Sequence, residues 1–234
     1  MADVPKVEMI LVPAGAEYQA VQRALRRAQN PPRAIAIPAG SQALLTFLSH
    51  GPKPAADGGI LLMGLGGSLS NQFSVGDRVL LRAVWDDTQA GRPLPYPCDG
   101  ALTEAIAQRC PGVAIAEGVS CDRVITAIAE KRYLGDHYGA AVVEMEGASL
   151  LQALPNCPIS ILRVISDDCR HELPDISAAI APDGSLRVRE LAWRFLQRPI
   201  AALRLIRGSL QGLKVLEQTA SHLFQRSGNS AIQR

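Results

Sequence analysis

The chain has 234 residues, of which 47% are hydrophobic and 20% are charged, and its formal net charge is +2 at pH 7. This composition predicts an α/β domain large enough to bury a full core, alone or with an appendage. It excludes a membrane-spanning helix, because no apolar run approaches roughly 20 residues, and the five scattered cysteines and the N-terminus predict a reduced, unexported protein.

The hydrophobic pattern alternates between strands and helices up to about residue 168. Short apolar runs predict buried strands, and apolar residues three or four positions apart predict helices. The predicted strands are residues 7–14, 33–39, 60–67, 75–85, 112–120, 140–146 and 158–168. The predicted helices are residues 16–29, 41–50, 99–110, 122–135 and 147–154. Because several strands are continuously apolar, we expect a mostly parallel sheet with helices on both faces.

The last quarter of the chain is basic and helical. Residues 187–226 carry six more positive than negative charges. A turn and a helix are predicted over residues 181–198, and from Pro199 a long helix with one apolar stripe over residues 200–223. The stripe has two interpretations, which are packing on the chain's own domain or a subunit partner, and contact with an anionic membrane through residues 200–224.

Acidic or glycine-rich residues follow four of the predicted strands. They are Glu17, Gly64-Leu65-Gly66-Gly67, Glu144-Met145-Glu146 and Ser166-Asp167-Asp168. Ligands of α/β sheets collect at the carboxyl ends of strands, so we expect these residues to surround one ligand. Each piece also has an ordinary explanation. The glutamates suit the first turn of a helix, and the glycine run lacks the third glycine of a dinucleotide-binding loop.

In combination, these motifs resemble the purine nucleoside phosphorylase and nucleosidase superfamily. The matching residues are Glu17, Gly64-Leu65-Gly66-Gly67, Val75-Gly76-Asp77, Val143-Glu144-Met145-Glu146 and Arg163-Val164-Ile165-Ser166-Asp167. The resemblance spans residues 7 to about 170, and the core is similar to methylthioadenosine/S-adenosylhomocysteine nucleosidases. It implies a three-layer phosphorylase-type fold with a central mixed, mostly parallel sheet. It also implies release of adenine from an adenosine-type nucleoside, without a cofactor or a metal.

The resemblance implies a role for each acid. Glu146 binds the ribose hydroxyls while Met145 packs on the sugar, and Asp167 protonates the purine with Ser166 as its orienting neighbour. These residue types suit the chemistry, because positive charge builds on the sugar and negative charge on the departing base. An acid that donates at neutral pH needs a raised pKa. We expect burial to raise that of Asp167, and Asp168 to be a turn cap on the opposite face.

The attacking group is predicted to be water. The resemblance places Glu17 where nucleosidases bind the attacking water. The segment directly after the first strand, residues 13–21, has no arginine to hold phosphate, and Gly64 occupies the serine position of phosphorylases. Gly64, Gly66 and Gly67 let the backbone approach a ligand closely. A phosphate-dependent phosphorylase is the alternative, and a catalytically inactive nucleoside-binding protein is the alternative from another class.

The base pocket and the C-terminus both bear on the substrate. Val124 stands where nucleosidases carry an aromatic ring that stacks on adenine, and the backbone near Ile125 is left to read the base edge. Residues 173–223 resemble the C-terminus of hopanoid-biosynthesis-associated phosphorylases. That resemblance implies removal of adenine from an adenosyl-hopane lipid at a membrane surface.

The expected organisation has three parts. Residues 1–185 form the nucleoside phosphorylase/nucleosidase-like domain, residues 186–226 a basic amphipathic helical extension, and residues 227–234 a disordered tail. We expect a small nucleoside as the ligand and no nucleic acid partner. We also expect a homo-oligomer, located in the cytoplasm with peripheral membrane contact through residues 200–224.

Overall fold

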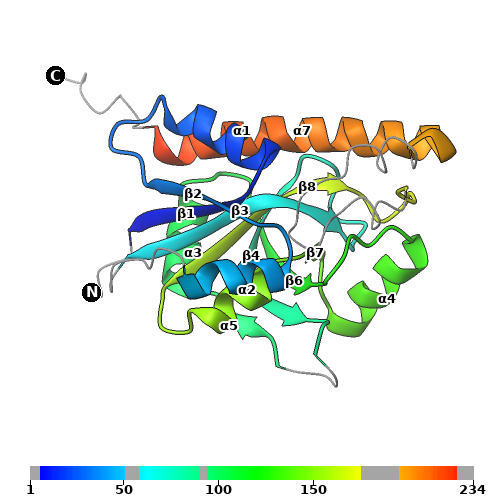
Figure 1. Ribbon diagram of the computed structural model, residues 1–234, viewed down its shortest axis with the longest axis horizontal. Coiled ribbons are helices and arrows are strands. Elements are labelled where there is room, and N and C mark those ends of the chain that lie inside the picture. The colour runs from blue at the N-terminus through cyan, green and yellow to red at the C-terminus, as the bar shows by residue number, and fades with distance from the viewer. Residues whose placement is uncertain (1–5, 51–57, 90–93, 175–194, 226–234) are drawn as a thin grey trace.

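A twisted sheet lies between two layers of helices in the computed structural model, which describes residues 6–50, 58–89, 94–174 and 195–225 (Figure 1). Within these ranges, eight strands form a single sheet. They are β1 (Val7–Pro13), β2 (Arg33–Ile37), β3 (Gly59–Ser68), β4 (Arg78–Asp86), β5 (Tyr96–Pro97), β6 (Ala114–Ser120), β7 (Val142–Glu144) and β8 (Ile159–Asp167). The expected α/β fold with a mixed, mostly parallel sheet is confirmed.

The strand pairing closes into a ring at the centre of the sheet. Strand β3 pairs with β8, β8 with β4, β4 with β6, β6 with β7, and β7 with the end of β3. Strands β1 and β2 extend the sheet from β3, and β5 extends it from β4. The ring brings the carboxyl end of β8 beside the end of β3, with Asp167 opposite Gly67. The candidate residues at these two strand ends are therefore neighbours.

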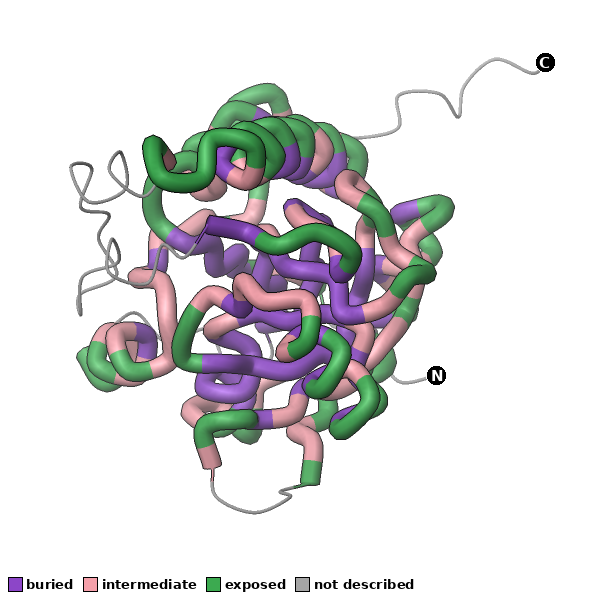
Figure 2. Tube along the Cα trace, turned by 90° about the vertical axis from the view of Figure 1, so that its right-hand side faces the viewer, coloured by how far each residue is buried: buried purple, intermediate pink, exposed green. Residues whose placement is uncertain are grey.

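Helices cover both faces of the sheet. They are α1 (Ala16–Leu25), α2 (Ser41–His50), α3 (Gly100–Gln108), α4 (Ile128–Tyr138), α5 (Gly147–Ala153) and α7 (Pro199–Phe224). Side chains of α1, α3 and α7 share one apolar cluster with the sheet, and side chains of α2 and α5 share another. Helix α4 packs at the ends of β6 and β7 in a third cluster. The strands between these layers are buried, as Figure 2 shows.

Two predicted helices are shorter than expected, each for a local reason. Helix α4 begins at Ile128 rather than at residue 122, because Ala127 has an extended backbone and the Thr126 carbonyl accepts a hydrogen bond from Leu173 N–H. Helix α1 ends at Leu25 rather than at residue 29, and the chain reverses direction through Asn30, whose φ is 54°. The loop before α4 is therefore free to contribute to a site.

Helix α7 lies beside α1 on the same face of the sheet (Figure 1). Its second half packs through Leu216, Ala220 and Leu223, and Glu217 forms a 2.8 Å ion pair with Arg23 of α1. Packing on the chain's own domain, one of the two expected interpretations, therefore holds for this half. None of the helices in the described ranges is long and apolar enough to cross a membrane.

The first half of α7 does not bury the predicted apolar stripe. Its buried side consists of Ala202, Gly208 and Gly212, whereas the large apolar side chains are exposed. A Cβ atom on Gly208 would overlap the carbonyl oxygen of Ser166 at the end of β8. Packing on the chain's own domain therefore does not hold for the large apolar side chains of this half, because these glycines bring the helix backbone directly onto the strand.

Parts of two expectations lie outside the described residues. They are the predicted tail over residues 227–234 and most of the turn and helix over residues 181–198. Where the structure resumes, a helical turn covers residues 195–197, and α7 starts at Pro199. A proline at the first helical position matches the predicted break, because that position needs no N–H donor.

We predict that Gly208→Ala destabilises the protein, although alanine is the better helix former. The added methyl group would force α7 away from the Ser166 carbonyl, and such overpacking costs about 1 to 3 kcal/mol. Thermal unfolding measures the effect. The exposed neighbour Arg207→Ala serves as the control and should change the unfolding free energy by less than about 0.5 kcal/mol. Equal stability of Gly208→Ala and the wild type would contradict the close packing.

Candidate active site

Three glycines in β3 make room for the candidate residues. Gly64, Gly66 and Gly67 lie within the strand, so the expected glycine loop is corrected to a glycine-rich strand end. A Cβ on Gly64 would overlap the Arg163 guanidinium and lie 3.0 Å from Glu17 Oε1. A Cβ on Gly67 would lie 2.9 Å from Asp167 Oδ2. The glycines therefore allow charged side chains from α1 and β8 to cross the strand.

Glu17 turns its carboxylate toward this strand. The residue lies in the first turn of α1, and its Oε1 accepts a hydrogen bond from Leu65 N–H. Burial of the carboxyl, together with repulsion from Glu146, raises the pKa of Glu17 from 4.5 to about 7, although Leu65 N–H and Arg163 act in the opposite direction. The alternative that Glu17 is only an exposed first-turn residue is therefore wrong.

Arg163 lies fully buried between the two glutamates of the Glu-Met-Glu motif. Its Nη2 forms ion pairs with Glu144 Oε2 and, at 2.9 Å, with Glu146 Oε2. Burial disfavours the charge on Arg163, but the two carboxylates outweigh it and raise the pKa of Arg163. The strand pairing alone would not bring these charges together. The glycines of β3 leave the space that the guanidinium occupies.

The two glutamates of the motif have different environments. Glu144 accepts hydrogen bonds from Ser120 Oγ and from the N–H groups of Glu146 and Gly147, the latter at 2.7 Å. It therefore stabilises the turn from β7 into α5, as the ordinary interpretation of a helix-start acid predicts. Glu146 accepts hydrogen bonds from Arg163 and from Gly40 N–H, so its carboxylate has capacity left for a ligand.

Burial raises the pKa of Glu146, and the Glu144 carboxylate adds to this effect. Arg163 and the Gly40 N–H group oppose it. The Arg163 Nε and Nη1 atoms are buried and have no hydrogen-bond partner among the residues that the structure describes. Since buried guanidinium groups are normally satisfied, this end of Arg163 is suited to donate to a ligand or to water.

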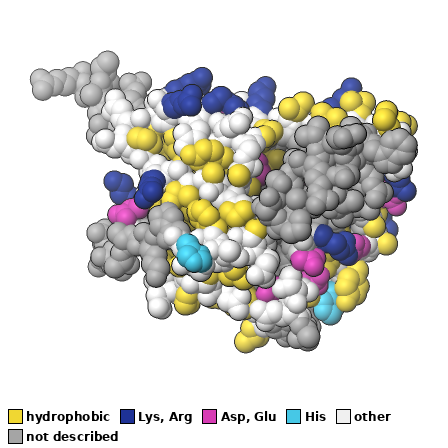
Figure 3. Space-filling view, in the orientation of Figure 1, with side chains coloured by type: hydrophobic (Ala, Val, Ile, Leu, Met, Phe, Trp, Pro, Cys, Tyr) yellow, Lys and Arg dark blue, Asp and Glu magenta, His cyan; other side chains and the backbone are white. Residues whose placement is uncertain are grey.

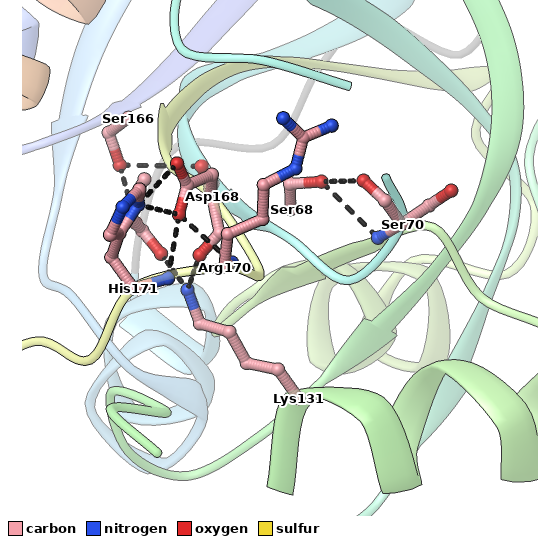
Figure 4. Close-up of polar contacts among 9 residues, drawn as sticks. Ser68, Ser70, Lys131, Ser166, Asp168, Arg170 and His171 are labelled. Carbon is pink, nitrogen blue, oxygen red and sulfur yellow. Dashed lines mark hydrogen bonds and ion pairs between the residues drawn. The ribbon is translucent and has the colours of Figure 1, made fainter. Parts of the chain in front are cut away.

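Asp167 is held by a residue on each of its carboxylate oxygens. Ser166 Oγ donates to Oδ1 at 3.0 Å, and the Lys131 ammonium of α4 forms an ion pair with Oδ2. Lys131 is fully buried and reaches from α4 to the loop after β8, as Figure 4 shows. The sequence predicted burial around Asp167 but not a cation in contact with it, and Lys131 is that cation.

The loop after β8 is anchored by Asp168. Its Oδ1 accepts hydrogen bonds from the N–H groups of Arg170 and His171, and its Oδ2 lies 2.9 Å from His171 Nδ1 (Figure 4). Burial would raise the pKa of Asp168, but the hydrogen bonds with His171 and Arg170 lower it. Asp168 is therefore a turn cap, as predicted from the sequence.

The predicted base-binding residues lie on the loop before α4. Ile125 is buried in the apolar cluster of α4, whereas Val124 is half-buried. The same loop is tied to the loop after β8 by the hydrogen bond between Leu173 N–H and the Thr126 carbonyl, at 3.1 Å. Val124 and Ile125 are thus connected to the strand end that carries Asp167.

A cavity of about 560 Å³ adjoins the Glu146 side of the site. Met145 and Gly40 line it together with polar side chains such as Gln42, Gln89 and Gln152. Gly40, which lines this cavity, donates its N–H to Glu146. The candidate ribose-binding carboxylate therefore lies next to the cavity. Its volume is in the range of small-molecule sites.

Two residues of the site were missed in the sequence. Lys131 lies three residues from both Ile128 and Leu134, which is the spacing of the buried helix face, and this spacing could have identified it. Arg163 was part of the Arg163–Asp167 motif but had no role assigned to it. A charged residue within an otherwise apolar strand indicates that an oppositely charged side chain is buried beside it. In the described part of the chain, no three His, Cys, Asp or Glu side chains are grouped as metal ligands.

Comparison with known proteins identifies relatives of this fold. The model of the family described as the phosphorylase superfamily matches residues 55–197. No curated protein matches the chain.

Several solved structures superpose over most of the chain. The 5′-methylthioadenosine/S-adenosyl homocysteine nucleosidase of Helicobacter pylori shares 14% identity at a TM-score of 0.66, covering 94% of this chain and 97% of that one. The futalosine hydrolase of the same organism, as a mutant, shares 13% at 0.66, covering 94% and 98%. The S-adenosylhomocysteine nucleosidase of Streptococcus pyogenes shares 17% at 0.65, covering 95% and 97%. At these identities the likeness establishes the fold.

We predict that Glu17→Gln stabilises the protein increasingly as the pH rises. The folded protein binds the Glu17 proton more tightly than the unfolded chain. Wild-type stability from this group is therefore complete below about pH 4.5 and is lost as the pH rises through about 7. Glutamine carries no such charge. Urea unfolding should show the variant gaining about 1 to 3 kcal/mol on the wild type between pH 5 and pH 8.

The control for this measurement is Gln19→Ala, an exposed and uncharged position on the same helix. Its stability difference from the wild type should not change with pH. A pH-independent difference for Glu17→Gln would show that the Glu17 carboxyl is not buried in solution.

Proposed function

Because this chain belongs to the phosphorylase superfamily, we propose that it hydrolyses the N-glycosidic bond of an adenosine-type nucleoside and releases adenine. One observation carries the proposal. The Glu17 carboxyl, with a pKa of about 7, lies at Gly64 beside an Arg163 Nη1 that has no partner among the described residues. This pair suits the binding and deprotonation of a water molecule near neutral pH.

Glu146 is the group that we assign to the ribose. Its carboxylate is anchored by Arg163 and Gly40 N–H, so it is held in one orientation and can accept hydrogen bonds from two sugar hydroxyls. A carboxylate fixed there also stabilises the positive charge that develops on the sugar as the bond to the base breaks. Met145, which lines the adjoining cavity, supplies an apolar surface for the sugar.

Water is favoured over phosphate by the charges in the site. Glu17, Glu144 and Glu146 surround a single guanidinium, and Glu144 and Glu146 both pair with it. A phosphate dianion placed near Glu17 would meet more carboxylates than cations, and the Coulomb repulsion is strong at a buried site. A neutral water molecule has no such cost. The lack of arginine in residues 13–21, directly after the first strand, also favours water, because no further cation is supplied there.

Asp167 is the group that we assign to the departing base. As the bond between C1′ and the purine nitrogen breaks, its electron pair moves onto the base, and a proton placed on the purine ring neutralises it. Ser166 orients the Asp167 carboxyl, and Val124 and Ile125 lie on the loop tied to the same strand end. The water oxygen then bonds to C1′, and its proton passes to Glu17.

We test this function by incubating the chain with adenosine, 5′-methylthioadenosine and a lipid-linked adenosine, with and without phosphate. We expect free adenine and free sugar in both conditions. The rate should rise with pH up to about 7, as Glu17 ionises. Glu17→Gln should lower kcat by at least about 100-fold, and Asp167→Asn should abolish turnover while nucleoside binding persists.

The outcomes separate the alternatives. A sugar phosphate product that forms only with phosphate would identify a phosphorylase. Nucleoside binding without adenine release from any substrate would identify an inactive binding protein. The exposed Glu104→Gln on α3 is the matched control, and its activity should equal that of the wild type.

We also propose that the first half of α7 contacts an anionic membrane, where a lipid-linked nucleoside would be met. Four large apolar side chains are exposed there, Ile200, Leu203, Ile206 and Leu210. The exposed Arg204 and Arg207 lie beside them. Figure 3 shows basic and apolar side chains along the edge formed by α7. Such a helix binds lipid head groups and buries its apolar face shallowly.

For the membrane contact, we expect the chain to co-sediment with phosphatidylglycerol vesicles and far less with phosphatidylcholine vesicles. The double variant L203N/I206N should lose most of this binding, because it removes apolar area without changing charge. The control Q218N changes an exposed polar position of the same helix and should bind like the wild type. A stable dimer that binds no vesicles and is dissociated by L203N/I206N would assign this face to a second copy instead.

A further inference from the structure

A buried lysine is in direct contact with the carboxylate that we assign to the departing base. Lys131 Nζ forms an ion pair with Asp167 Oδ2 and donates a 2.7 Å hydrogen bond to the Asp168 carbonyl. The Lys131 side chain is 0% exposed, and that of Asp167 is 13% exposed. The lysine therefore reaches solvent only through Asp167 and its neighbours, and Figure 4 shows it extending from α4 to that strand end.

Burying a lysine is costly for folding. Removing an ammonium group from water carries a penalty of several kcal/mol, which one ion pair barely offsets. An apolar side chain at the same place on α4 would pack between Ile128 and Leu134 without that penalty. A charge at such a position indicates a functional role that an apolar residue could not fill. The only carboxylate it contacts in the described residues is Asp167.

The same contact creates a difficulty for Asp167 alone as the acid. A cation against a carboxylate favours the ionised form, and an ionised carboxylate has no proton to give. The ion pair as a whole, however, holds one transferable proton.

We propose that Lys131 is a positioning residue for Asp167 that stores the proton destined for the purine. The inference rests on the function proposed above. As the bond to the base breaks, a proton moves from Lys131 Nζ to the ionised Asp167 carboxylate. The Asp167 carboxyl then passes this proton to the purine ring nitrogen. Lys131 is left neutral and Asp167 ionised. The proton that Glu17 took from water leaves to solvent, and solvent restores the proton to Lys131 after product release.

The surroundings leave this pair as the proton-carrying unit of the strand end. The nearby charged groups are engaged elsewhere, since Asp168 pairs with His171 and Arg170 donates to Asn71. On α4 itself, Glu130 pairs with Arg123 at the surface. Glu172 of the same loop pairs with Arg198 before α7. Ser166, the remaining contact of Asp167, is neutral.

The test compares pH profiles of the full chain with those of Lys131→Met and Lys131→Gln. Glutamine can still donate to Asp167 and Asp168 but carries no transferable proton. In both variants Asp167 must take its proton from solvent, so the loss of kcat/KM should grow with pH. We expect less than about tenfold loss at pH 5 and more than about 100-fold at pH 9. Arg132→Met, at the exposed next position of α4, is the matched control and should follow the wild type.

The outcomes distinguish a stored proton from a structural role. A merely structural lysine would lower activity by the same factor at every pH, and this result would overturn the inference. Full activity of Lys131→Gln at every pH would also overturn it. If both variants fail to fold, the wild-type profile decides. Its kcat/KM should hold well above the pH range in which an isolated carboxyl loses its proton, and a decline within that range would refute the stored proton. A wild type that releases no purine refutes the proposed function itself.

Discussion

The arrangement of the site depends on one buried guanidinium. Arg163 lies inside the sheet, fully removed from water, and its charge is offset by Glu144 and Glu146. A lone buried charge would be strongly destabilising, so this cluster must form as the chain folds. Because the guanidinium fills the space over Gly64, the strand end cannot carry a side chain there. Because Glu144 also binds the turn into α5, the same cluster fixes where Glu146 points. One interaction thus accounts for the glycines of β3, the turn into α5 and the orientation of the Glu146 carboxylate.

The site divides the labour of its acids by their environments. Glu144 has its oxygens occupied by donors and serves the fold. Glu146 retains acceptor capacity, and Glu17 has a pKa near 7. Asp167 differs from all three, because its contact is a lysine from another helix rather than Arg163. The structure therefore places two separate cations in the site, Arg163 beside Glu144 and Glu146, and Lys131 beside Asp167. This separation suits a reaction in which charge of opposite sign develops at the two ends.

Much of the fold could be predicted from the sequence because apolar strands alternate with amphipathic helices. The approach of Glu17 and Asp167 to β3 followed from the rule that parallel strands present their carboxyl ends at one edge, because β1 and β8 run parallel to β3. Glu146 follows β7, which runs antiparallel to β3, and its place in the site depends on its ion pair with Arg163. The start of α4 and the orientation of α7 did not follow. Periodicity counts apolar residues, whereas α7 approaches β8 through Gly208 and Gly212 and leaves its leucines outside. Lys131 was missed for a related reason, since a charged residue on a helix is ordinarily assigned to the solvent face.

The contact between Gly208 and Ser166 has a mechanical consequence. No methyl group fits between the helix backbone and that carbonyl, so α7 cannot move toward β8, and moving away would uncover the strand directly before Asp167. The helix backbone therefore acts as a stop for the strand end. A displacement of α7 is therefore transmitted directly to the Ser166 backbone, one residue before the Asp167 carboxylate, because no side chain lies between them.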